Sequence, residues 1–162
     1  MWLELSRWQI ALLNVLGIPA AHLLISWWVT QWPTPLVERL LRFLPIPRSE
    51  AAIHRLVGVR RWKRLLPDAA GWFGGVSKGE LPAIFAKDDN GLKAFRVEAG
   101  RGEFAHWLQL AVISSFVIWT PGAGAWVIVA YAGLSNLPCL LSLRSLRLRL
   151  DKLINAKSCP DR

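Results

Sequence analysis

The 162-residue sequence has only two cysteines and three histidines. Cys139 lies inside an apolar stretch and Cys159 lies near the end, so they form no C-x-x-C pair and have no histidine at metal-ligand spacing. We therefore expect neither a disulfide framework nor a structural zinc site. The histidines are scattered, and no acidic pair stands at ligand spacing, so no metal site is predicted.

Several catalytic signatures are also missing. The sequence has no G-x-S-x-G nucleophile elbow, no P-loop and no dinucleotide-binding glycine fingerprint. No aspartate follows a histidine by four or five residues, so the H-x4-D acyltransferase box is absent too. Nucleophilic serine catalysis has no local support, and direct transfer assisted by a general base is the simpler chemistry.

Charged residues are absent from two long apolar stretches, Trp8–Trp32 and Phe104–Leu143. A helix needs about 20 mainly apolar residues to cross a bilayer, and the first stretch is too long for a signal-peptide core of about 7–15 residues. The second stretch is interrupted by Thr120-Pro121-Gly122-Ala123-Gly124, which predicts a turn and hence a helical hairpin. The predicted fold is an all-α integral membrane protein with about three transmembrane helices, one N-terminal span and a C-terminal hairpin of about 103–119 and 125–143.

Tryptophan, in contrast, is abundant, with ten residues against one tyrosine and one methionine. Many of the indoles lie near the ends of apolar runs, as aromatic belts do at membrane interfaces. They are Trp8, Trp27, Trp28, Trp32, Trp107, Trp119 and Trp126. Core filling in a soluble helical bundle is the alternative, and the span lengths make it the less favoured one.

The basic residues indicate an orientation. The section from Pro33 to Glu103 holds 13 Lys/Arg against 8 Asp/Glu, and the tail from Arg144 holds 6 against 2. The positive-inside tendency places both regions on the cytoplasmic side, with the N-terminus outside, in a multi-pass protein of the inner membrane. The positive charge then reflects topology and attraction to anionic lipid, and no groove-reading element supports nucleic-acid binding.

Four sections follow from this pattern: an N-terminal anchor (1–32), a basic interfacial section with short helices (33–103), the hairpin (104–143) and a basic tail (144–162). Within the interfacial section, apolar spacing predicts a helix over Leu36–Leu44 in the interface plane, a second helix opening after Ser49, and a short charged helix over Leu92–Arg101.

Glu103 and His106 form the best candidate site. They are three residues apart, so they share a helix face at the mouth of the second span, with Glu98 and Arg101 just before them. A carboxylate that orients an imidazole makes a general base near neutral pH. The alternative is that His106, beside Trp107, only anchors the helix at the headgroups, and spacing alone favours that reading.

Two further features have a functional and a structural reading. The basic run from His54 to Arg64 is either a patch for anionic lipid, which is favoured without context, or a phosphate clamp for an acyl donor. His22 lies within the first apolar stretch and is expected to make a hydrogen bond between helices.

Four motifs together resemble the glycosyl-4,4'-diaponeurosporenoate acyltransferase family. They are Arg61-Trp62-Lys63-Arg64-Leu65-Leu66-Pro67, then Gly71-Trp72-Phe73-Gly74-Gly75-Val76-Ser77-Lys78, then Glu98 with Arg101-Gly102-Glu103-Phe104-Ala105-His106-Trp107, and finally Asn136-Leu137-Pro138-Cys139. They fall in the family's order and extend over roughly residues 10–152.

The resemblance implies a small membrane enzyme that esterifies a sugar hydroxyl of a glycosylated carotenoid or related glycolipid, with an acyl donor such as acyl-CoA as co-substrate and no cofactor. Carried onto this chain, it implies His106, Glu103 and Glu98 as catalytic residues. The implied substrate-binding residues are Arg61, Trp62, Lys63, Arg64, Trp72, Asn136, Arg144 and Arg147.

One segment departs from the family's pattern. The family usually has Gln-Arg-Tyr-Asn-Arg-x-Arg where this chain has Leu143-Arg144-Ser145-Leu146-Arg147-Leu148-Arg149. The arginines remain, and the family's Gln, Tyr and Asn are replaced by Leu143, Ser145 and Leu146. A second hypothesis therefore stands beside the acyltransferase: a non-catalytic small subunit that binds pigment or lipid within a larger membrane complex.

Overall fold

The computed structural model describes residues 5–47, 49–62 and 89–157. Every regular element in these ranges is a helix, which confirms the all-α prediction. The helices are α1 (Arg7–Thr30), α2 (Thr34–Leu41), α3 (Glu50–Leu56), α4 (Val59–Trp62), α6 (Asp89–Ser114), the 3₁₀ helix η4 (Ser115–Ile118) and α7 (Ala123–Lys157).

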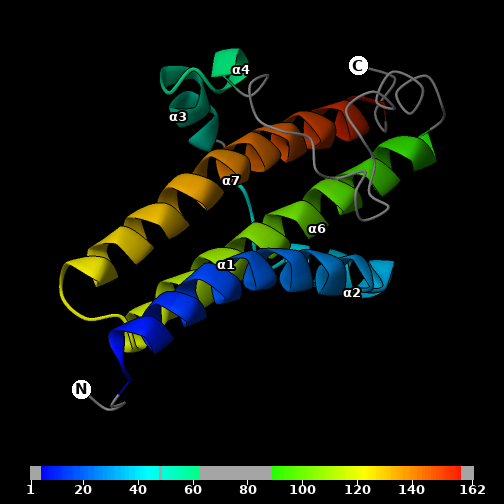
Figure 1. Ribbon diagram of the computed structural model, residues 1–162. Coiled ribbons are helices and arrows are strands. Elements are labelled where there is room, and N and C mark those ends of the chain that lie inside the picture. The colour runs from blue at the N-terminus through cyan, green and yellow to red at the C-terminus, as the bar shows by residue number, and fades with distance from the viewer. Residues whose placement is uncertain (1–4, 48, 63–88, 158–162) are drawn as a thin grey trace.

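The long helices α1 and α7 both run antiparallel to α6 (Figure 1). Side-chain hydrogen bonds fix the register of α1: Asn14 donates to Thr120 just after η4, and the Thr30 carbonyl accepts from Arg101 in the middle of α6. The N-terminal end of α1 therefore lies beside the turn between α6 and α7. The short helices lie toward the opposite end, where α2 packs on α6 and α3 contacts α7.

Helix α1 begins with a capping box and then presents apolar side chains outward. The Ser6 hydroxyl accepts a hydrogen bond from the Gln9 backbone N–H, and the Gln9 side-chain oxygen accepts one from the Ser6 backbone N–H. Two otherwise unpaired backbone donors are thereby satisfied. Among its residues only Val29 is fully buried. Its exposed large apolar residues are Trp8, Leu12, Leu13, Val15, Leu16, Leu23, Leu24, Trp27 and Trp28.

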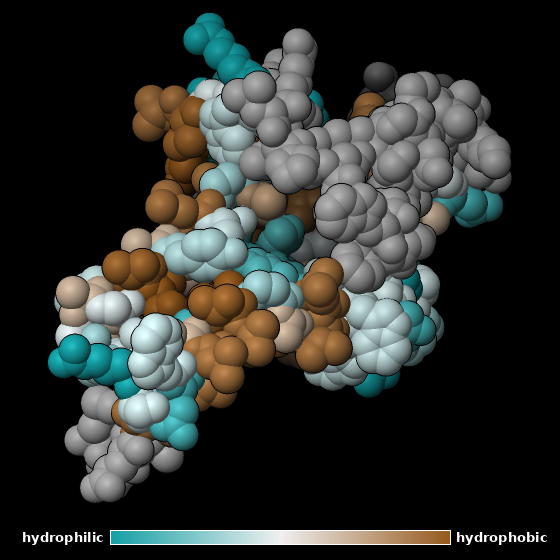
Figure 2. Space-filling model, in the orientation of Figure 1, coloured by the Kyte–Doolittle hydropathy of each residue, from teal (hydrophilic) through white to brown (hydrophobic). Residues whose placement is uncertain are grey.

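Two helices, α1 and α7, are long and apolar enough to cross a membrane by length and composition. The exposed leucines and tryptophans of α1 also favour a membrane location for this helix, because monomeric soluble proteins rarely expose large apolar patches. Helix α6, which contains the predicted second span, is not one of the two. The brown apolar surface in Figure 2 extends over much of the visible face of the described residues.

The α6–α7 hairpin is longer than the sequence predicted at both of its open ends. The predicted charged helix over Leu92–Arg101 is continuous with the first hairpin arm, and α7 runs to Lys157 through most of the predicted tail. The reason is packing: Leu92 and Phe95 on α6 form a buried cluster with Leu150 on α7. At the turn, Gly122 has φ 59°, a left-handed conformation that suits glycine.

Helix α2 packs its apolar face on protein. Val37 and Leu41 are buried and form a cluster with Val97 of α6. Gly100 permits this close approach, because a Cβ built there would lie only 2.7 Å from Leu41 Cδ1. The helix predicted over Leu36–Leu44 is thus present as Thr34–Leu41, and α6 covers Val37 and Leu41.

Candidate functional site

Glu103 is the most completely enclosed acidic side chain in the described part of the chain. Its relative exposure is 0%, and its two carboxylate oxygens face two arginines of α7. Oε1 accepts from Arg144 Nη1 at 2.7 Å, and Oε2 accepts from Arg147 Nη1. Burying a carboxylate is costly unless it is paired and hydrogen-bonded, and here two guanidinium groups meet that condition.

The same arginines connect α7 to α3 and to the segment before it. Arg144 donates to both oxygens of Glu50, at 2.6 and 2.7 Å, and Arg147 donates to the carbonyl of Leu44 at 3.3 Å. The hydrogen bond from Arg144 is the main reason why the pKa of Glu50 lies below its ordinary value of 4.5. Burial of the carboxylate acts in the opposite direction and raises this pKa. We call Glu50, Glu103, Arg144 and Arg147 the ion network; it fastens α3 to the hairpin.

His106 is oriented by Asn136 and not by Glu103. His106 Nδ1 lies 3.0 Å from Asn136 Oδ1. The Asn136 amide nitrogen donates to the Ala132 carbonyl at 3.0 Å and to Ser135 Oγ at 3.1 Å, so its oxygen is the atom that faces the ring. An accepting oxygen at Nδ1 places the proton on Nδ1 and leaves the lone pair on Nε2.

This arrangement changes the expected relationship between Glu103 and His106. Both residues lie on one face of α6, as their spacing predicted, and that face meets α7. Each meets a different partner there, because the arginines and Asn136 lie on different turns of α7. The carboxylate thus belongs to the ion network, and the amide takes the ring-orienting position that the sequence had suggested for the carboxylate.

A layer of polar side chains surrounds His106 within the bundle. Gln109, one turn further along α6, donates to the His22 carbonyl at 3.2 Å and to Ser26 Oγ at 3.0 Å. His22 Nε2 lies 3.4 Å from the hydroxyl of Tyr131 on α7, as expected of a residue that bonds between helices. Three helices therefore contribute polar groups to one level of the bundle.

Glu98, the third predicted catalytic residue, lies apart from this layer. It pairs with Arg101 at 3.2 Å on its own helix, and its side chain is 30% exposed. Arg101 also reaches Thr34 Oγ1 at 3.4 Å. These contacts stabilise the entry of the chain into α2, and the structure does not bring Glu98 to His106.

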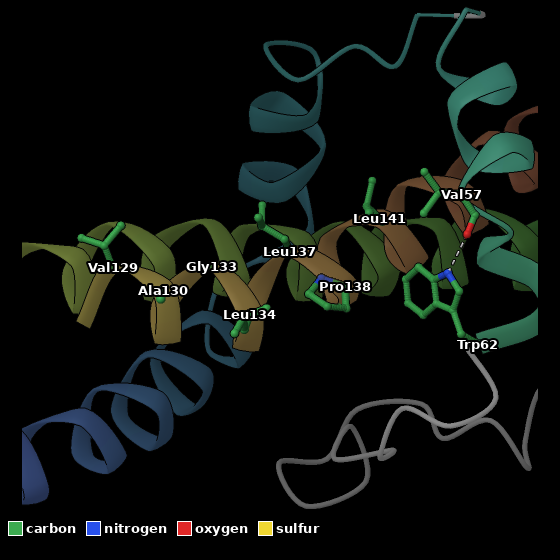
Figure 3. Close-up of a pocket in the computed structure, with 9 residues that line it drawn as sticks. All are labelled: Val57, Trp62, Val129, Ala130, Gly133, Leu134, Leu137, Pro138 and Leu141. Atoms are coloured by element: carbon green, nitrogen blue, oxygen red, sulfur yellow. Dashed lines mark hydrogen bonds between the residues drawn. The ribbon is translucent and has the colours of Figure 1, made fainter. Parts of the chain in front are cut away.

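The described part of the predicted basic motif is α4. Trp62 Nε1 donates to the Val57 carbonyl at 3.0 Å, and Arg61 is exposed. The predicted substrate-binding residues Lys63, Arg64 and Trp72 lie outside the described residues. Trp62 also lines an apolar groove of about 590 Å³ along α7, shown in Figure 3.

This groove was not predicted from the sequence. Its walls come from α7 and from the α3–α4 region, with Trp62 and Val57 at one end (Figure 3). The only local signal in the sequence is the pair Gly133 and Pro138 inside an apolar run, which indicates a shallow helix surface without indicating what lies over it. The remaining lining residues are Val129, Ala130, Leu134, Leu137 and Leu141.

In residues 5–47, 49–62 and 89–157, no group of three or more histidine, cysteine, aspartate or glutamate side chains could hold a metal ion.

The segment that departs from the family's pattern lies in the α6–α7 interface. Leu143 and Leu146 pack against the buried cluster that contains Leu92, and Ser145 is buried. A Cβ built at Gly102 would lie 3.1 Å from Leu143 Cδ1, so the two helices are in close contact there. The replaced positions therefore serve helix packing in this chain.

A family model described as glycosyl-4,4'-diaponeurosporenoate acyltransferase matches residues 26–156. The chain belongs to this family. The match contains the ion network, His106 with Asn136, and the groove, and it confirms the predicted family. The family description supports an acyltransferase activity in general terms. No curated protein and no solved structure matches the chain.

Proposed function

We propose that this protein is a membrane acyltransferase that esterifies a sugar hydroxyl of a glycosylated carotenoid, or of a related glycolipid, with a fatty acyl group. The family match supports acyl transfer, and the hydrogen bond between His106 Nδ1 and Asn136 Oδ1 is the observation that supports a mechanism. An imidazole with a fixed tautomer, half-buried within a polar layer, is suited to general-base catalysis.

In the proposed reaction, His106 Nε2 removes the proton from the sugar hydroxyl as the oxygen attacks the acyl carbonyl. The new C–O ester bond forms, and the bond from the carbonyl carbon to the donor's leaving group breaks. With a thioester donor, the leaving group departs as a thiolate and takes the proton from the imidazolium. Asn136 holds the ring through Nδ1 and stabilises the charged form by accepting its hydrogen bond.

The ion network has a positioning role in this proposal. Both oxygens of Glu103 are engaged by arginines, so the carboxylate is poorly placed to accept a substrate proton. The predicted roles of Glu103 as a catalytic residue, and of Arg144 and Arg147 as substrate-binding residues, give way here to fastening α3 and the hairpin end. Glu98 pairs with Arg101, whose contact with Thr34 stabilises the start of α2.

For the membrane, we propose that α1, the C-terminal half of α6 and α7 cross the bilayer, with the α6–α7 turn and the N-terminal end of α1 on the outer side. The basic helices α2 to α4 and the end of α7 then meet the cytoplasmic leaflet. The antiparallel register of α1 and α6 supports this arrangement, because it brings the two charge-poor ends together.

The decisive experiment uses purified full-length protein in lipid nanodiscs with a fatty acyl-CoA and glycosyl-4,4'-diaponeurosporenoate. Ester formation is followed by chromatography and mass spectrometry. We expect turnover by the wild type and a loss of at least about 100-fold in His106→Ala, the usual contribution of a general base. Val112→Ala, which shortens an exposed apolar side chain on α6 outside the polar layer and the ion network, serves as the control and retains activity.

Wild-type protein that is folded but esterifies no sugar lipid would contradict the proposal. Pigment or partner subunits that copurify with such an inactive protein would instead support the second hypothesis, a non-catalytic binding subunit.

A further inference from the structure

We infer that the apolar groove along α7 is the binding site for the fatty acyl chain of the donor. The inference rests on the proposed function for the identity of the ligand. It adds a subsite and a determinant of chain length that neither the motifs nor the family match assigns. The groove has a volume of about 590 Å³, and every lining side chain is apolar or aromatic.

The shape of the groove suits a single hydrocarbon chain. Its lining residues on α7 run from Val129 to Leu141, which corresponds to about 18 Å along a helix axis at 1.5 Å per residue. An extended long-chain acyl group has this length, whereas the rigid conjugated rod of a carotenoid is considerably longer. The exposed α7 side chains Leu134 and Leu137 would lose water or lipid contact to the bound chain.

The two ends of the groove differ in a way that gives the acyl chain a direction. The end at Val129 lies in the apolar part of α7. At the other end lie Trp62 and Val57 (Figure 3). Arg61, the neighbour of Trp62, is exposed on α4. An acyl donor with an anionic headgroup would therefore place its tail toward Val129 and its polar end toward Arg61.

Gly133 provides the depth at the middle of the groove. A Cβ added there would meet only Leu137 Cδ1, at 3.7 Å, which is an ordinary van der Waals contact. A Cβ at Gly133 thus requires no movement of its neighbours, and the rest of a larger side chain would project into the volume that the acyl chain would occupy. This position offers a direct test of the assignment.

The first measurement does not depend on catalysis. Protein in nanodiscs is exposed to a palmitic acid that carries a photoactivatable diazirine on its tail, and labelled peptides are mapped by mass spectrometry. We expect labelling concentrated at residues 129–141 and reduced by excess palmitoyl-CoA. Gly133→Leu should reduce it about tenfold or more, since it displaces two or three methylenes. Ala111→Leu, at an exposed position of α6, is the matched control and should leave the labelling unchanged.

The second measurement compares acyl donors of different length. Gly133→Leu should lose activity with long-chain acyl-CoA through a higher KM and retain it with short-chain acyl-CoA, so that the preferred length becomes shorter. Chain-length preference identical to the wild type would overturn the inference. If no variant esterifies any acceptor, the proposed function fails, and the labelling still decides whether the groove binds an acyl chain.

Three outcomes of the labelling would overturn the inference. A photoactivatable phosphatidylcholine that labels residues 129–141 without competition from palmitoyl-CoA would identify the groove as a site for ordinary membrane lipid. Competition by the glycosylated carotenoid alone would assign the groove to the acceptor. Uniform labelling of exposed apolar positions, with Trp8 and Trp126 labelled as strongly as the groove, would show that no specific site exists.

Discussion

His106 and Asn136 stand 30 residues apart in the sequence and meet side chain to side chain across the α6–α7 interface, with 3.0 Å between Nδ1 and Oδ1. The amide nitrogen of Asn136 is committed to its own helix, so its oxygen is directed at the ring. A single hydrogen bond thus determines which imidazole nitrogen carries the proton and which remains free for chemistry.

This relationship predicts that Asn136→Ala lowers kcat without a matching rise in KM. The imidazole would lose its fixed tautomer and orientation, and we expect a decrease of about 10- to 100-fold, near the lower end of what a positioned general base contributes. Steady-state kinetics in nanodiscs provide the measurement. Ser135→Ala, which removes a neighbouring hydroxyl that bonds the same amide, is the control and should change kcat far less.

The ion network predicts that Glu103 matters more for stability than for chemistry. Glu103→Ala leaves the buried Arg147 and the partly buried Arg144 without their shared carboxylate, and we expect the free energy of unfolding to fall by about 3–5 kcal/mol. Unfolding in mixed detergent micelles, followed by circular dichroism, would measure this change. Glu98→Ala, which removes a half-exposed pair with Arg101, should cost less than about 1 kcal/mol. A Glu103 variant that unfolds like the wild type yet has no activity would restore the catalytic role.

Glu50 predicts a loss of stability in acid. Its folded-state pKa lies below the ordinary value of 4.5, so the folded protein binds the proton more weakly than the unfolded chain. The resulting stabilisation is present above about pH 4.5 and is lost as the pH falls through the lower folded-state value. Glu50→Gln should therefore be less stable than the wild type at neutral pH, and the difference should narrow below pH 4.5. Thermal unfolding of both proteins across pH 3 to 7 is the measurement, and parallel curves would contradict the prediction.

The contrast between two helical glycines gives a prediction about packing. Gly100→Ala would push a methyl group to within 2.7 Å of the buried Leu41 side chain, so we expect a loss of about 1–3 kcal/mol from the displacement of α2. Gly133→Ala makes only an ordinary van der Waals contact with Leu137 and replaces a helical glycine, so it should be neutral or stabilise by up to about 1 kcal/mol. Denaturant titration of the two variants compares them directly.

The proposed orientation predicts which ends of the helices are accessible from each side of the membrane. A single cysteine placed at Ala123, in a background with Cys139 and Cys159 replaced by serine, should react with a membrane-impermeant maleimide added outside intact cells. A single cysteine at Ser49 should react only after the cells are opened. Both positions are exposed in the structure, so accessibility is not limited by the fold. Reaction of both from the same side would overturn the topology and the membrane part of the proposed function.

The sequence by itself determined the helical class, the position of the hairpin turn and the family. These depend on local properties: uncharged apolar stretches long enough to span a bilayer, a Pro-Gly turn, and short motifs in a fixed order. The ends of the helices were less well determined. The beginning of α6 and the end of α7 depend on Leu92 and Leu150, which are far apart in the chain and favour longer helices only when they pack together.

The tertiary structure alone decided the partners of the polar side chains. The spacing of Glu103 and His106 placed both on one face of α6, but it could not say which helix that face would meet or which side chains would lie opposite. The register between the two helices set Arg144 and Arg147 against the carboxylate, and it set Asn136 against the ring. The groove depended in the same way on where α3 and α4 lie over α7. Contacts across an interface depend on the relative shift of whole helices, which residue spacing along one helix does not contain.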